Sequence, residues 1–198
     1  MKTKSKALLM TLCAVLLVAA SVLGTMAYLT SQDSVKNTFS IGKINITLDE
    51  AKVDTDGTPV QGAARVKENT YKLMPGHEYD KDPTVHVDAD SEDSYIFVKV
   101  ENEITDIEAD TKIAAQITAK GWNQLTDANG APVANVYYKV YDGTVKDFVV
   151  FENFKIADTV DAKALESYAG KTIKITAYAV QMDGFANAKA AWDAAKFN

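Results

Sequence analysis

Cysteine and histidine are nearly absent from this 198-residue chain, which contains one cysteine and two histidines. The cysteine, Cys13, lies in an apolar N-terminal stretch, so residues 28–198 contain no thiol. This absence excludes disulfides, a thiolate nucleophile and cysteine-ligated zinc from that part of the chain. Its stability must therefore come from packing, which a domain of this length can supply.

The first histidine does not belong to a complete zinc-protease motif. His77 and Glu78 begin like HExxH, but Lys81 stands where the second histidine would be. Pro75 and Gly76, directly before them, indicate a turn where the motif needs a helix. This segment therefore predicts no metalloprotease site.

The second histidine, His86, lies on the polar face of a predicted strand, where we expect it to be exposed to solvent. The chain also has no GxSxG motif and no glycine-rich phosphate loop. We therefore predict no catalytic residue, no cofactor and no metal site. The alternative is a zinc site made of both histidines and one carboxylate, such as Glu78, Asp80 or Asp88.

The N-terminal segment has the layout of a secretory signal peptide. Three lysines precede residue 7, residues 7–20 are apolar apart from one threonine, and small residues stand at positions 24, 25 and 27. We expect Gly24 to break the helix and a signal peptidase to cut between Ala27 and Tyr28, which gives a signal peptide (1–27) and one exported domain (28–198). The alternative is a membrane anchor, because residues 7–29 carry no charge and could span a bilayer. In both cases the domain lies outside the cell, and only an uncleaved segment would contact the membrane.

Acidic residues outnumber basic residues by 27 to 21. Removal of residues 1–27 would take away three lysines and no acid, leaving 18 basic and 27 acidic residues and a net charge of −9. Such a product repels nucleic acid and anionic membrane surfaces. We therefore expect neither as a partner.

Apolar and polar residues alternate soon after the predicted cleavage site, as in a strand with one dry face. The apolar positions are Phe39, Ile41, Ile44, Ile46 and Leu48. Their parity switches across Gly42, which predicts a β-bulge there. A strand of this kind can pair within its own domain, or it can be donated to the sheet of a neighbouring molecule.

Turn signals divide the rest of the chain into short elements. We expect strands at 70–74, 83–87, 94–100, 133–141, 147–151 and 171–181, with 94–100 central because both of its faces are apolar, and 133–141 paired with 147–151 as a hairpin. We expect short helices at 110–120, capped by Asp110, at 161–169, and after a cap at Asp183. About seven or eight strands with small helices in the connections predict an all-β fold, an antiparallel β-sandwich.

Three segments together resemble the TasA/camelysin family of secreted proteins of Gram-positive bacteria. They are AYLTSQDSVKNTFSIGKINITL (27–48), YKLMPGHEYDKDPTVHVDADSEDSYIFVKVEN (71–102) and TAYAVQMDGFANAKAAWDAA (176–195). The resemblance implies a jelly-roll-like sandwich, processing by a SipW-type signal peptidase, and assembly into fibres of a biofilm matrix. It also implies a second activity that the family has been assigned, a metalloprotease that degrades casein.

The predicted function is therefore that of a secreted structural protein of the extracellular matrix or cell surface, without enzymatic activity. Its partners would be further copies of itself and an accessory matrix protein, with the peptidase acting during export. Strand exchange by Phe39, Ile41, Ile44, Ile46 and Leu48 would build the fibre. The alternatives are a secreted camelysin-like metalloprotease and a monomeric surface adhesin.

Overall fold

The computed structural model describes residues 3–28, 42–109 and 111–197. The chain separates into two units, Met1–Ser40 and Ile41–Asn198. In the first unit the described backbone is one helix, α1 (Thr3–Tyr28), and the described side chains of residues 5–19 are exposed. Among the described residues, no helix is both long enough and apolar enough to cross a membrane.

Gly24 does not end α1, contrary to the prediction, because the helix continues to Tyr28. A single glycine costs a helix only about 1 kcal/mol relative to alanine, and helix-forming residues stand on both sides of it. The predicted cut between Ala27 and Tyr28 falls at the C-terminal end of this helix. Cleavage itself stays a prediction.

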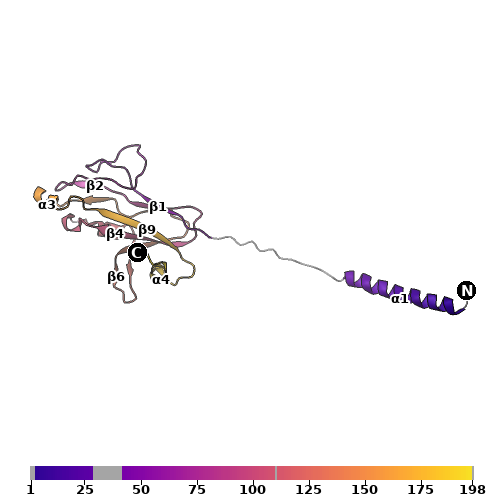
Figure 1. Cartoon of the computed structure of the whole chain (residues 1–198). Helices are drawn as coiled ribbons and strands as arrows, with labels where there is room; N and C mark the ends of the chain where they lie inside the picture. The colour runs from indigo at the N-terminus through magenta and orange to yellow at the C-terminus, as the bar shows by residue number, and fades with distance from the viewer. Residues whose placement is uncertain (1–2, 29–41, 110, 198) are drawn as a thin grey trace. The chain divides into compact units, whose positions relative to one another are not determined.

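The second unit is built from antiparallel sheets with short helices in the connections, which confirms the β-rich class (Figure 1). The four-stranded sheet has the order β5 (Asn123–Thr126), β6 (Pro132–Tyr141), β4 (Ser94–Asn102), β9 (Ile173–Gln181). The three-stranded sheet has the order β1 (Ile46–Asp49), β3 (Thr84–Val87), β7 (Asp147–Val149). A third sheet pairs β2 (Glu78–Asp80) with β8 (Asn153–Lys155).

The predicted central strand is confirmed, since β4 lies between β6 and β9. The predicted hairpin is wrong, because β6 pairs with β4 and β5 whereas β7 pairs with β3. Residues 142–146 carry the chain from one sheet to the other. Tyr141 and Phe148, on either side of this crossing, are both buried in the same hydrophobic cluster. β7 therefore pairs with β3 of the three-stranded sheet and not with β6.

No strand forms at residues 70–74, where one was predicted. Side-chain bonds replace a ladder in this segment: the Tyr79 hydroxyl accepts from Met74 N at 2.7 Å and donates to Lys72 O at 2.7 Å. The turn predicted at Pro75 and Gly76 is present, and Gly76 has a φ of +71°.

The described part of the second unit contains four helical segments, a 3₁₀ turn (Thr105–Ile107), α2 (Ile113–Ala119), α3 (Ala162–Glu166) and α4 (Ala188–Ala195). The predictions of α2 and α3 are confirmed, and Asp161 caps α3 by accepting from Ala164 N at 2.7 Å. Lys112 is the N-cap residue of α2, and the predicted cap, Asp110, lies outside the described residues. The cap predicted at Asp183 is wrong, because this residue enters a turn and Asn187 caps α4.

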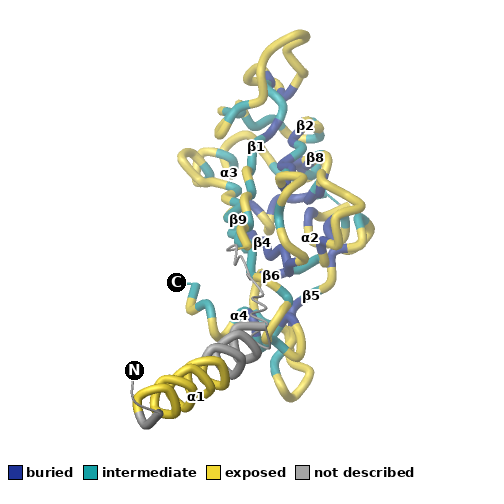
Figure 2. Tube along the Cα trace, turned by 90° about the vertical axis from the view of Figure 1, so that its right-hand side faces the viewer, coloured by how far each residue is buried: buried dark blue, intermediate teal, exposed yellow. Residues whose placement is uncertain are grey.

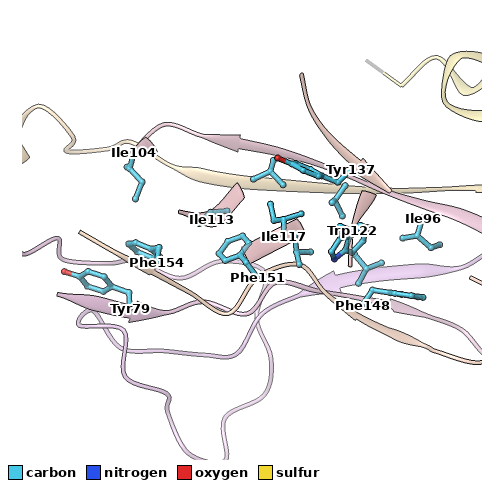
Figure 3. Close-up of a cluster of buried hydrophobic side chains, with 14 of the residues drawn as sticks. Tyr79, Ile96, Ile104, Ile113, Ile117, Trp122, Tyr137, Phe148, Phe151 and Phe154 are labelled. Carbon is cyan, nitrogen blue, oxygen red and sulfur yellow. The ribbon is translucent and has the colours of Figure 1, made fainter. Parts of the chain in front are cut away.

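Two hydrophobic clusters lie on opposite faces of the four-stranded sheet. The larger one takes side chains from both main sheets, including Val85 of β3 and Ile96 of β4, together with Ile117 of α2 and Phe154 of β8 (Figure 3). The smaller one lies under α4 and includes Phe97. Buried residues are gathered along the strands of this unit (Figure 2).

Candidate functional site

The outer edge of β9 has no partner strand among the described residues. Glu103 N donates to Thr172 O at 3.0 Å, and Met182 N donates to Asp93 O at 2.9 Å. Because bonded positions alternate in an antiparallel pair, the even-numbered residues of β9 face β4. The peptide groups of the odd-numbered residues face the open edge, and these are Ile173, Ile175, Ala177, Ala179 and Gln181.

The edge of β1 opposite β3 is open over part of its length. Asp88 N donates to Asn45 O at 3.0 Å, so the odd-numbered residues face β3 and the peptide groups of Ile46 and Leu48 face away. Lys67 Nζ donates to Leu48 O, and Glu50 pairs with Val66 through bonds of 2.9 and 2.8 Å. The edge is therefore occupied near its C-terminal end and has no strand beside Ile46 in the described chain.

These two edges lie next to each other. Cα atoms of β1 approach those of β9 to within 8 Å, yet the two strands are not paired. A cavity of about 860 Å³ opens between the C-terminal part of β1 and the N-terminal part of β9. Its walls include Leu48, Tyr71, Tyr168, Ile173 and Ile175. The unpaired edges and this cavity form the candidate site, which we call the open side.

A buried ion pair lines the cavity. Lys81 Nζ donates to Glu50 Oε2, and the two side chains are only 8% and 7% exposed. Asn69 Nδ2 donates to the other carboxylate oxygen at 3.0 Å. The ring centroid of Tyr71 lies 5.8 Å from the ammonium nitrogen, and burial, together with the charge of Glu50, raises the pKa of the Tyr71 hydroxyl.

Sequence reasoning missed this cluster. In the sequence, Lys81 stands out only as the residue that interrupts the histidine motif, and Glu50 lies 31 positions away from it. No short-range spacing marks such a pair. The one available signal is a lysine beside a buried strand, and surface lysines are too common for that signal to be specific.

His86 belongs to a charged network on the outer face of the three-stranded sheet, and not to a free surface as predicted. Its Nδ1 lies 2.6 Å from Asp147 Oδ1 and its Nε2 lies 2.9 Å from Asp49 Oδ1. Carboxylates only accept, so both ring nitrogens can donate to them when His86 is protonated. Burial alone would lower the pKa of His86, but the bonds to Asp147 and Asp49 outweigh it and raise the pKa.

The other histidine has a structural role as well. His77 Nε2 lies 2.8 Å from Asp56 O, and its ring packs edge-on against Tyr79 with centroids 4.6 Å apart. Within residues 3–28, 42–109 and 111–197, no three histidine, cysteine, aspartate or glutamate side chains are grouped to hold a metal ion. The arrangement offers backbone donors and acceptors at a strand edge, which suit a peptide ligand.

The predicted assembly strand is only partly described. Phe39 and Ile41 lie outside the described residues, and Ile44 lies just before β1. Ile46 and Leu48 form part of β1, opposite Val87 and Val85 of β3.

The bulge predicted at Gly42 stays a prediction, because residues 39–41 lie outside the described residues. Gly42 itself is exposed and precedes β1.

Comparison of the chain with models of known protein families, with curated proteins and with solved structures gives no match. The geometry of the open side is therefore the basis for a functional assignment.

Proposed function

We propose that the chain is a secreted structural protein of the TasA/camelysin type that assembles into extracellular fibres by strand exchange. The observation that carries this proposal is the edge of the nine-residue strand β9, which pairs with no strand of the described residues and lies beside a second such edge. A long unpaired edge is a template for another strand, and proteins that remain monomeric usually cover it or place charges on it. In this proposal the two main sheets are the layers of a jelly-roll-like sandwich, and the added strand lies along its open side.

The segment between the predicted cut and β1 has the pattern of such a strand. Every even position from 30 to 40 is polar, whereas the apolar residues Leu29, Val35, Phe39 and Ile41 all stand at odd positions. A strand with this alternation has one apolar face and one polar face. The apolar face would pack against the core, and the strand's backbone would pair with the β9 edge.

The position of β1 restricts which residues can be donated. Ile46 and Leu48 are already paired with β3 in their own domain, so β1 stays in place and the donated part precedes it. About fourteen extended residues from 28 to 41 would reach roughly 46 Å. Donation to the next molecule is heterologous, and a head-to-tail contact that does not close into a ring gives a filament.

Cleavage would control this assembly. In the uncut chain the donated segment is continuous with α1, which would hold it at the site of export. The SipW-type peptidase would release it by cutting between Ala27 and Tyr28, and the filament would then grow outside the cell with an accessory matrix protein as a second partner.

Electron microscopy and sedimentation of purified residues 28–198 test this proposal. We expect filaments from this protein and only monomers after deletion of residues 28–36, with an unchanged midpoint of urea unfolding. A matched pair tests the alternation: Val35→Asp should block growth and Ser34→Asp should permit it, because the two substitutions add the same charge to opposite faces. Monomers under all conditions of pH, salt and concentration would contradict strand exchange and leave a monomeric adhesin.

A further inference from the structure

We propose that Lys81 and Asn69 become joined by an intramolecular isopeptide bond, with Glu50 transferring the protons. The three side chains meet in the wall of the cavity, where one carboxylate bridges the amine and the amide. This inference needs only these residues and does not depend on fibre assembly.

The geometry brings a nucleophile, the Lys81 amine, and an electrophile, the Asn69 amide, to one base, the Glu50 carboxylate. Lys81 Nζ donates to Glu50 Oε2, and Asn69 Nδ2 donates to Glu50 Oε1 at 3.0 Å. The amine and the amide nitrogen that it would replace are therefore bridged by the same carboxylate. The nucleophile and the leaving group both lie within hydrogen-bond reach of the base, Glu50, as proton transfer by a side chain requires.

The amide of Asn69 is held in a fixed orientation. Its Oδ1 accepts from Val53 N at 3.1 Å, and its Nδ2 also donates to Ala51 O at 2.8 Å. A backbone N–H that points at the amide oxygen stabilises the negative charge that develops there when the carbonyl carbon is attacked. The site therefore contains an oxyanion donor in addition to the reacting groups.

The reaction is balanced without any oxidant or cofactor. Glu50 takes a proton from the Lys81 ammonium, and the free amine attacks Cγ of Asn69 to form a new C–N bond. Collapse of the tetrahedral intermediate breaks the bond from Cγ to Nδ2, and Glu50 gives the proton to the departing nitrogen. Glu50 then takes the second proton from the newly bonded Lys81 nitrogen and passes it to the released ammonia. The products are a secondary amide between the two side chains and one ammonium ion, and Glu50 is again a carboxylate.

The surroundings favour this transfer. The ring of Tyr71 lies 5.8 Å from Lys81 Nζ and packs edge-on against Tyr79 and Phe154, with centroid distances of 5.8 and 5.1 Å. Both side chains are buried, so water is kept away from the groups that exchange the proton. The ion pair of Lys120 with Glu152 is, by contrast, exposed to solvent, since its side chains are 34% and 60% exposed.

The bond would close a loop of 13 residues from Asn69 to Lys81. Both ends of this loop line the cavity of the open side. The cross-link would fix that wall covalently in a chain that has no cysteine after residue 27. A protein exposed outside a cell would thereby gain a bond that reducing agents cannot open.

Mass spectrometry of the denatured full chain tests the proposal. We expect the wild type to weigh about 17 Da less than its sequence, the mass of one ammonia. Glu50→Gln keeps Lys81 and Asn69 but removes the base, so its mass should equal that of its sequence. Lys81→Arg keeps the charge but removes the amine, and its mass should also equal that of its sequence. Lys67→Arg, on an exposed lysine of the same cavity, is the matched control and should keep the loss.

Peptide mapping of the wild type locates the bond even where a variant does not fold. Trypsin should leave Lys81 uncut and release residues 68–72 joined to residues 73–99. A wild-type mass equal to that of the sequence, with cleavage after Lys81, would overturn the proposal. So would an ammonia loss located at the exposed Asn129 and Gly130 pair, where a succinimide gives the same mass change.

Discussion

The four-stranded and three-stranded sheets are joined differently at their two pairs of edges. Where β5 and β7 are the edge strands, Trp122 is buried and its Nε1 donates to Val149 O at 2.8 Å, so an indole joins one sheet to the other. Lys139 Nζ lies 5.5 Å from the Trp122 ring and 5.6 Å from the Phe148 ring. We call this the closed side. On the open side, between β1 and β9, a cavity takes the place of such a contact.

This difference separates stability from association. Side chains on the closed side bury apolar area and satisfy an edge carbonyl, which stabilises the folded chain. The open side leaves backbone groups of β9 without a strand among the described residues, so a partner can still bind there. Changes to the closed side should therefore lower the free energy of unfolding, whereas changes to the open edge should lower the tendency to assemble.

The largest effect on stability is expected from Trp122→Ala. The side chain is 2% exposed, and removal of a buried tryptophan costs about 3–5 kcal/mol because a cavity is left behind. Urea unfolding followed by circular dichroism measures the change. Trp122→Phe keeps much of the packing and loses the bond to Val149 O, so it should cost about 1–3 kcal/mol. Similar losses for the two variants would contradict the assignment of a packing role to the indole.

Proline at Ala177 tests the open edge. The N–H of Ala177 faces away from β4, so its loss removes no ladder bond, and we expect the free energy of unfolding to change by about 1 kcal/mol or less. An added strand would lose a donor, so filament growth seen by electron microscopy should be blocked.

The neighbouring position is the control for this substitution. The N–H of Thr176 faces β4, and Thr176→Pro should cost about 3 kcal/mol or more because a ladder bond is lost. Equal destabilisation by the two prolines would show that the edge of β9 is not open in solution.

Sequence patterns located single elements better than the contacts between them. The apolar run of β4 and the short helix within residues 161–169 were predicted because the signal is contained in a few consecutive residues. The pairing of β7 with β3 was missed, since Phe148 and Val85 lie far apart in the chain and meet only when both are buried. The pair of Glu50 and Lys81 was missed for the same reason.

The smallest effect concerns His86, which links β1 of the open side to β7 of the closed side through Asp49 and Asp147. Its pKa is raised in the folded chain above the ordinary value of about 6.5. The stabilisation is therefore complete below about pH 6.5 and is lost as the pH rises through the folded pKa. The two ion pairs are partly exposed, so we expect them to contribute less than about 1 kcal/mol to the free energy of unfolding. Their loss at high pH should lower Tm by no more than about 2–4 °C. Thermal unfolding at pH 6 and at pH 8 measures this effect. The Tm of His86→Gln should not fall between the two pH values, and an equal fall in wild type and variant would show that His86 is not its cause.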